Sequence, residues 1–209
     1  MSTLKKVAVI ATSTRTPSIG TKVAELVKDI IAADAEGNGI DLSLVQVANL
    51  KLPVFDEQVI PAQVPAVGNF AHEHSKAWSS EIAKYDAYIA VVAEYNSGLS
   101  GAAKNAIDYL YHEWIGKPIA VVSYGIMGGK SASAQAQKTL EGMKLRVAPT
   151  RPALAFAGGP GPDLVAAMGG EIGEESRKKW EGESETLLQA FGELKELLNT
   201  PPPKPKTKQ

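Results

Sequence analysis

The chain has 209 residues, of which 44% are hydrophobic and 22% charged, which is typical of a globular protein large enough for one α/β domain. Its 22 basic and 23 acidic side chains nearly balance, which argues against non-specific nucleic-acid binding because such binding depends on neutralising phosphates. The absence of cysteine excludes disulfides, thiol nucleophiles and cysteine-based zinc sites. No signal-peptide pattern and no run long enough to span a bilayer is present, so we expect a cytoplasmic protein without a membrane partner.

Apolar runs and helical periodicities alternate along the chain. Runs rich in valine and isoleucine, or with alternating polarity, predict strands at 6–11, 40–47, 87–93, 118–123 and 151–157. Helices are predicted at 21–33, 69–83, 101–111, 130–144 and 174–198. The prolines within 49–66 prevent a regular assignment there.

This alternation predicts an α/β fold, a parallel sheet with helices on both faces. Five strands fit the flavodoxin-like doubly wound order 2-1-3-4-5. We expect residues 1–199 to form one domain. The glycine-rich and proline-rich stretch 158–173 is predicted to be a loop or mobile segment, and 200–209 a disordered Pro/Lys tail.

In such a sheet a ligand binds beyond the carboxyl ends of the strands, and three polar loops are expected to converge there. The first, TSTRTPSIG, supplies several hydroxyls, the guanidinium of Arg15 and a helix start near Ser18. A helix N-terminus presents unpaired N–H groups and partial positive charge, so this loop suits a phosphate. The alternative is that Ser18 only caps the helix and the rest forms a turn. The position after a buried strand, with an arginine, favours the anion site.

The second polar loop reads EYNSG and follows the third predicted strand. Glu94 needs a partner at the end of a buried strand, and Tyr95 can stack on a planar ring. Asn96 can donate and accept hydrogen bonds, and Gly98 allows close approach of a backbone. The alternative is that Glu94 forms a salt bridge, Tyr95 packs in the core, and Ser97 with Gly98 makes a turn. This loop alone supports both interpretations equally.

The third loop, SYGIMGGKS, follows the fourth predicted strand. Its GGKS resembles a nucleotide-binding P-loop, but the P-loop pattern needs a glycine where this chain has Tyr124. A glycine turn that wraps the edge of a planar ligand is therefore the favoured interpretation. His72 and His74 are spaced wrongly for one helical face, so we expect no metal site.

Together the three loops resemble the NAD(P)H-dependent FMN reductase family, flavodoxin-like enzymes that include quinone and azo-compound reductases. The motif positions are 12–15 (G-S-x-R), 93–96 (P-E-Y-N), 104–108 (K-N-A-I-D) and 123–129 (S-x-G-x-x-G-G). Thr12 replaces a glycine of the family pattern and Ala93 replaces a proline, and neither change is expected to abolish flavin binding. The resemblance extends roughly over residues 5–157.

The resemblance implies that FMN binds across the three loops. The FMN phosphate would be held by Ser13, Arg15, Ser18, Ile19 and Gly20. The ribityl chain and isoalloxazine ring would lie along Glu94, Tyr95, Asn96 and Ser97. The other edge of the ring would be flanked by Ser123, Tyr124, Gly125 and Gly128. No side chain is expected to act as general acid or base, because the flavin carries the chemistry.

The resemblance also implies an oxidoreductase that takes hydride from NADPH or NADH and passes electrons to a quinone, an azo compound or free flavin. It implies a homodimer or homotetramer. The alternative is a non-enzymatic electron carrier or redox-sensing protein with the same flavin pocket. The near-neutral charge weakens that alternative, because flavodoxin-type carriers tend to be strongly acidic for docking. A nucleotide hydrolase built on GGKS is disfavoured by the glycine spacing.

Overall fold

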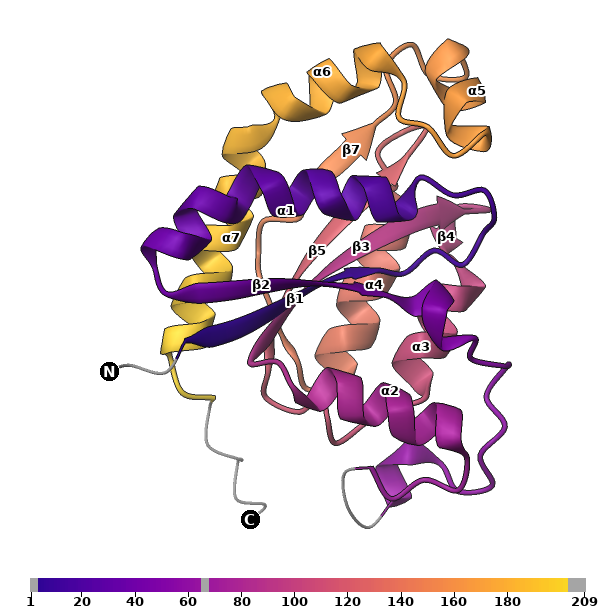
Figure 1. The fold of residues 1–209 in the computed structure, drawn as a ribbon, viewed down its shortest axis with the longest axis vertical. Coiled ribbons are helices and arrows are strands. Elements are labelled where there is room, and N and C mark those ends of the chain that lie inside the picture. Colours follow the sequence, from indigo (N-terminus) through magenta and orange to yellow (C-terminus); the bar gives the residue numbers. More distant parts are fainter. Residues whose placement is uncertain (1–3, 65–67, 203–209) are drawn as a thin grey trace.

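The computed structural model describes residues 4–64 and 68–202 of the chain. Its centre is a sheet with the strand order β2-β1-β3-β5-β6, with β4 added to β3 and β7 added to β5 (Figure 1). The strands are β1 (Lys5–Ala11), β2 (Ile40–Gln46), β3 (Ala87–Tyr95), β4 (Gly98–Leu99), β5 (Pro118–Gly125), β6 (Arg146–Val147) and β7 (Ala153–Ala155). All pairs except β3–β4 are parallel. With β6 and β7 together as the fifth strand, the predicted order 2-1-3-4-5 is confirmed.

The fifth strand differs from its prediction, because it is interrupted. Arg146 and Val147 pair with the start of β5, and Ala153–Ala155 pair with its end. The connecting stretch contains Pro149 and Pro152, which have no N–H to donate to a ladder. The prediction of one continuous strand at 151–157 was therefore wrong in its bounds.

Helices cover both faces of the sheet (Figure 1). They are α1 (Gly20–Gly37), α2 (Glu73–Ala83), α3 (Gly101–Asp108), α4 (Lys130–Gly142), α5 (Pro162–Met168), α6 (Glu174–Gly182) and α7 (Ser184–Asn199). Along β1, Val7 and Val9 join the apolar cluster under α1 and α7, whereas Ala8 and Ile10 join the cluster under α2, α3 and α4. The continuous apolar run of β1 is thus explained by burial on both faces.

Three helix predictions and one loop prediction needed correction. The helix predicted at 174–198 is two helices, because the helical conformation is interrupted at Glu183, between Gly182 and Ser184. The stretch 158–173, predicted to be a loop, contains α5, whose Pro162 suits the first position of a helix. The helices predicted to cover 69–83 and 101–111 are shorter, beginning at Glu73 and ending at Asp108.

The long segment between β2 and α2 has little regular structure beyond two 3₁₀ turns, η1 (Val47–Leu50) and η2 (Pro61–Gln63). It is fastened to α3 by one side chain. The Oδ1 atom of Asn105 accepts the N–H of Phe55 at 3.0 Å, and its Nδ2 donates to the carbonyl of Pro53 at 2.7 Å. Within the K-N-A-I-D stretch, Asn105 therefore has a structural role in fixing this segment.

The C-terminal end of α7 is fixed to the sheet edge. Arg146 donates to the carbonyls of Leu197 and Thr200, each at 2.7 Å. The predicted disordered tail begins at Thr200, and its residues 203–209 lie outside the described part of the chain. Over the described ranges, no helix combines the length and the apolarity that crossing a bilayer requires.

Candidate functional site

A cavity of about 290 Å³ lies where β1, β3 and β5 end. Of the site residues predicted from the sequence, it is lined by Ser13, Arg15, Ser18, Ile19, Glu94, Tyr95, Tyr124 and Gly125. Each of the three polar loops contributes to this set. The expectation that the loops converge at the carboxyl ends of the strands therefore agrees with their positions.

The first loop gathers hydroxyl groups at the start of α1. The hydroxyl of Ser18 donates to Ser13 Oγ at 2.9 Å and accepts the N–H of Gly20 at 3.0 Å. Ile19, at the N-cap of α1, provides no side-chain cap. The N-terminal N–H groups of α1 therefore add their partial positive charge next to these hydroxyls.

Gly20 does not line the cavity but lies directly beneath the hydroxyl cluster. A Cβ atom at Gly20 would come within 2.8 Å of Ser13 Cβ and 3.0 Å of the Tyr124 hydroxyl oxygen. Only glycine lets the helix start this close to both side chains. The space for a small anion beside Ser13, Ser18 and Tyr124 thus depends on Gly20.

Arg15 has a partner that the sequence did not reveal. Its guanidinium donates to the carbonyl of Ala167 at 2.7 Å and to that of Met168 at 3.3 Å. These are the last residues of α5, so the positive charge lies at the negative end of that helix. A guanidinium has further N–H groups, which leaves donors for an anion in the cavity. Arg15 therefore links the first loop to α5 while lining the cavity.

Thr12, which stands where the family pattern has glycine, extends the sheet. Its backbone N–H and its hydroxyl both donate to the carbonyl of Val91, at 3.2 and 2.9 Å. The side chain is turned into the sheet and is buried. The substitution therefore leaves the cavity side of this loop to Ser13 and Arg15.

The second loop is a tight hairpin between β3 and β4. Glu94 pairs with Leu99 and Tyr95 with Gly98, so Asn96 and Ser97 form the turn. Both turn residues have positive φ, 49° and 58°, as a two-residue type I′ hairpin requires. Asn96 and Ser97 belong to this turn and not to the cavity lining. Their predicted contact with a flavin stays a prediction.

Glu94 caps the helix that follows the third loop. Its Oε2 atom accepts the N–H of Ser131 at 2.9 Å and that of Ala132 at 3.2 Å. These N–H groups are at the start of α4, whose N-cap residue Gly129 offers no side-chain cap. The carboxylate at the end of a buried strand is therefore stabilised by a helix N-terminus rather than by a salt bridge.

The third loop is a turn with no room for a side chain at Gly128 or Gly129. A Cβ at Gly128 would lie 2.7 Å from the carbonyl oxygen of Ala153, and Gly128 has φ of 82°. Ser123 is fully buried and its hydroxyl donates to the carbonyl of Gly128 at 2.7 Å. Ser123 and Gly128 thus shape the turn, whereas Tyr124 and Gly125 line the cavity.

Tyr124 remains protonated over the physiological range. Burial raises the pKa of Tyr124 to about 12. Its hydroxyl is therefore a neutral donor or acceptor and not a general base. Together with Ser13 and Ser18 it forms a neutral polar cluster beside the charge of Arg15.

The sequence reasoning did not assign six further lining residues to the site. They are Ala93, Ile126, Phe156, Leu164, Ala167 and Met168. Ala93 and Ile126 lie next to predicted residues in the loops. The three from α5 were missed because their segment was predicted to be a loop. A proline at the first helical position followed by DLVAAM and two glycines is a signal for a short helix.

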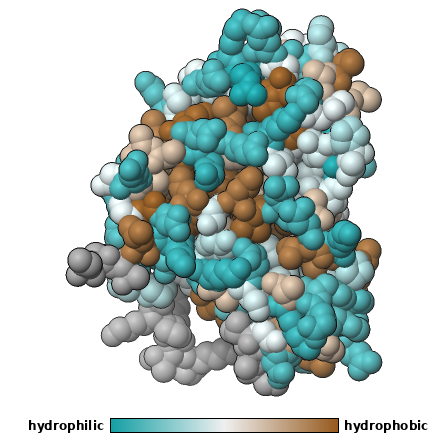
Figure 2. Space-filling model, in the orientation of Figure 1, coloured by the Kyte–Doolittle hydropathy of each residue, from teal (hydrophilic) through white to brown (hydrophobic). Residues whose placement is uncertain are grey.

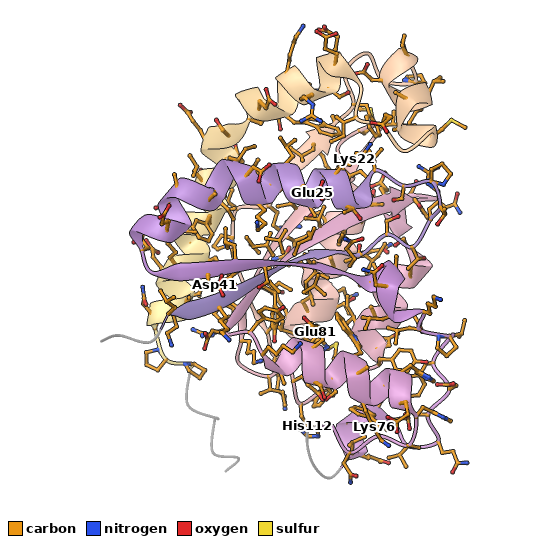
Figure 3. All side chains as sticks on the ribbon, in the orientation of Figure 1. Lys22, Glu25, Asp41, Lys76, Glu81 and His112 are labelled. Carbon is orange, nitrogen blue, oxygen red and sulfur yellow. The ribbon has the colours of Figure 1, made fainter. Side chains whose placement is uncertain are left out.

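The histidines lie away from this cavity. The rings of His72 and His74 stack at 5.2 Å, and His74 Nε2 lies 2.8 Å from Asp56 Oδ1. Among residues 4–64 and 68–202, no group of three or more histidine, aspartate or glutamate side chains is placed to hold a metal ion. His112 is likewise remote from the start of α1 (Figure 3).

Comparison with known proteins decides the family. The family model described as NADPH-dependent FMN reductase matches residues 5–159. The chain belongs to this family. It is 46% identical over 202 residues to the NAD(P)H-dependent FMN reductase ntnL of Nectria sp, covering 95% of this chain and 99% of that protein. It is 33% identical over 147 residues to a quinone reductase of Pseudomonas putida, covering 67% and 72% of the two chains.

A solved structure of similar fold is FerB of Paracoccus denitrificans, a flavoenzyme NAD(P)H:(acceptor) oxidoreductase. The two chains superpose with a TM-score of 0.62 at 23% identity, over 90% of this chain and 98% of FerB. At 23% identity this likeness supports the fold of the chain, a flavodoxin-like fold, and nothing further. The match to the family model ends at 159, before α5 begins.

Proposed function

We propose that this chain is an FMN-dependent NAD(P)H oxidoreductase whose flavin occupies the cavity at the ends of β1, β3 and β5. Residues 1–199 would form its single flavin-binding domain. The observation that carries the assignment is the convergence of Ser13, Ser18 and Arg15 at the N-terminus of α1. Membership of the NADPH-dependent FMN reductase family supports both the cofactor and the reaction.

The donor set at the first loop fits a phosphate monoester. Two hydroxyls and the N-terminal N–H groups of α1 supply hydrogen bonds, and Arg15 supplies a positive charge. Among the described residues that line the cavity, Glu94 is the one carboxylate, and its Oε2 atom already accepts two N–H groups at the start of α4. Ser13, Arg15 and Ser18 would therefore hold the FMN phosphate.

The other end of the cavity fits a flat ring. Tyr95, Ile126 and Phe156 offer apolar and aromatic surface, and Gly125 allows the backbone to approach closely. A bound flavin would supply the hydride chemistry, taking electrons from NADPH or NADH. The protein's own part is to bind and orient the ring and to exclude water from one face. We assign no side chain as acid or base.

Electrons would leave to a quinone, an azo compound or free flavin. The P. putida relative is named a quinone reductase, which supports the quinone class. The first experiment is an absorption spectrum of the purified protein, with the released chromophore identified by mass. A flavin spectrum and FMN mass are expected, and a colourless protein that binds no added FMN would refute the proposal.

Steady-state oxidation of NADPH and NADH in the presence of a quinone separates an enzyme from a non-enzymatic flavin carrier. Catalytic turnover is expected with at least one of the two dinucleotides. A flavin-loaded protein that shows a single reduction event and no turnover would instead be a carrier or redox sensor.

We further propose a cytoplasmic homodimer or homotetramer. Ile126 and Met168, which line the cavity, are exposed by 44% and 63%, and Met127, next to Ile126 in the chain, is exposed by 73%. A rim of large apolar side chains is typical of a surface that a second chain covers. Size-exclusion chromatography with light scattering tests this directly, and a monomer at micromolar concentration would contradict it.

A further inference from the structure

The short helix α5 lies beyond the part of the chain that the family model matches, yet it forms one wall of the cavity. The match ends at 159 and α5 spans Pro162–Met168. Leu164, Ala167 and Met168 all line the cavity. In Figure 1 this helix lies at upper right, near the N-terminal end of α1. It is therefore a wall of the candidate site that the family model does not describe.

The C-terminal end of α5 is held against the first loop. Arg15 donates to the carbonyls of Ala167 and Met168. The next turn packs tightly, since a Cβ at Gly170 would lie 3.0 Å from Pro17 Cβ. Lys22, at the N-terminal part of α1 (Figure 3), forms an ion pair with Glu171 at 2.5 Å. The loop predicted to bind phosphate and the helix thus form one unit.

The N-terminal end of α5 is fixed to α6. Asp163 Oδ2 accepts the N–H of Ser176 at 2.5 Å, and the buried Ser176 hydroxyl accepts the N–H of Ala157 at 2.9 Å. A Cβ at Gly173 would clash with the carboxylate of Asp163, so no side chain fits there. Contacts at both ends give the helix a defined position although glycines flank it.

The surface that α5 presents to the cavity is apolar. Leu164, Ala167 and Met168 are spaced three and four apart, so they share one face of the helix. None of the three side chains can donate a strong hydrogen bond. Val165, which does not line the cavity, points elsewhere and is 67% exposed. Apolar surface is visible in the region of α5 in the space-filling view (Figure 2).

We propose that α5 selects the electron acceptor, with Leu164 and Met168 limiting the size and polarity of the compound that enters beside the flavin. Arg15 acts as the positioning residue that holds this wall. The inference rests on the proposed function, because it takes the cavity to contain FMN. The geometry favours small, flat, apolar acceptors such as one-ring quinones over bulky azo compounds.

The proposal predicts a change in selectivity. Leu164→Ala and Met168→Ala, singly and together, enlarge the cavity at the α5 wall and remove apolar contact with small acceptors. Measured with FMN-saturated protein, the ratio of kcat/KM for a two-ring azo dye to that for benzoquinone should rise about tenfold in the double variant, the scale of a few methylenes in a binding pocket. Val165→Ala is the matched control on the same helix and should leave the ratio unchanged.

An unchanged ratio in a double variant that retains wild-type FMN content would overturn the assignment. Leu164→Met is a second control, because it changes the side chain but nearly conserves its volume, and it should keep the wild-type ratio. If the wild-type protein binds no FMN, the proposed function fails instead. The two failures are therefore distinguishable.

The role of Arg15 is tested without flavin, by hydrogen exchange of the apo protein. In Arg15→Ala, the amides of 162–168 should exchange at least about tenfold faster than in wild type, because two hydrogen bonds to the end of α5 are lost. Asp29→Ala, at an exposed position of α1, is the control and should leave exchange in this segment unchanged. Equal exchange in wild type and Arg15→Ala would show that Arg15 does not position the helix.

Discussion

Replacing Glu94 with alanine tests the connection between the end of β3 and the start of α4. The carboxylate accepts two backbone N–H groups of that helix, at 2.9 and 3.2 Å. Loss of a side-chain cap costs about 1 kcal/mol, and loss of a negative charge at a helix N-terminus costs about 0.5 kcal/mol. We therefore expect Glu94→Ala to lower the free energy of unfolding by about 1.5 kcal/mol and Tm by about 3–6 °C.

The assay is urea and thermal unfolding of the apo protein followed by circular dichroism, so that flavin binding does not contribute. Glu94→Gln keeps an acceptor oxygen but removes the charge, and should lose only about 0.5 kcal/mol. Glu181→Ala removes a half-exposed carboxylate whose partner Arg177 lies 4.0 Å away, and should stay within about 0.5 kcal/mol of wild type. Wild-type stability of Glu94→Ala would refute the capping role.

Three further changes probe the cavity. Arg15→Ala should weaken FMN binding about tenfold to hundredfold, the value of a charge-assisted hydrogen bond. Riboflavin, which has no phosphate and is affected only through the loosened α5, should lose less affinity than FMN in a fluorescence titration. Gly128→Ala should lower the free energy of unfolding, measured by chemical denaturation, by about 3 kcal/mol, because its positive φ and the carbonyl of Ala153 oppose a side chain. Gly142→Ala is the control, because a Cβ there meets nothing within 4 Å, and it should change stability by less than about 1 kcal/mol. Because the pKa of Tyr124 is raised from 10.0 to about 12, its neutral form stabilises the fold below pH 10 and this contribution is lost as the pH rises to about 12. Between pH 10 and about 12, the free energy of unfolding should therefore fall by about 2–3 kcal/mol less in Tyr124→Phe than in wild type. An identical pH profile of the two proteins would contradict the burial argument.

The order of the sheet was predictable because each strand carries its own local signal. The valine-rich runs of β1, β3 and β5 are buried on both faces, and a continuous apolar run is the sequence signal of such a strand. From that order follow the edge of the sheet at which a ligand binds and the three loops that meet there. The first and third loops place Ser13, Arg15, Tyr124 and Gly125 at the cavity.

Contacts between distant parts of the chain were not predictable. The partners of Glu94 lie 37 and 38 positions away, and those of Arg15 lie 152 and 153 positions away. No local pattern encodes such pairings. The hairpin at Asn96 and Ser97 was missed for another reason, since neither residue is the glycine that most often signals positive φ. At α5, flanking glycines concealed a helix that is only seven residues long.

Asn105 shows that a motif residue can fix the path of a distant segment of the chain. Its single amide gives residues 53–55 the donor and the acceptor that a neighbouring strand would otherwise provide. Aspartate at this position would present two oxygens to the carbonyl of Pro53 and turn an attraction into a repulsion. The path of the segment from β2 to α2 therefore depends on a side chain of α3. Loss of activity on changing Asn105 would reflect a displaced segment and not the loss of a catalytic group.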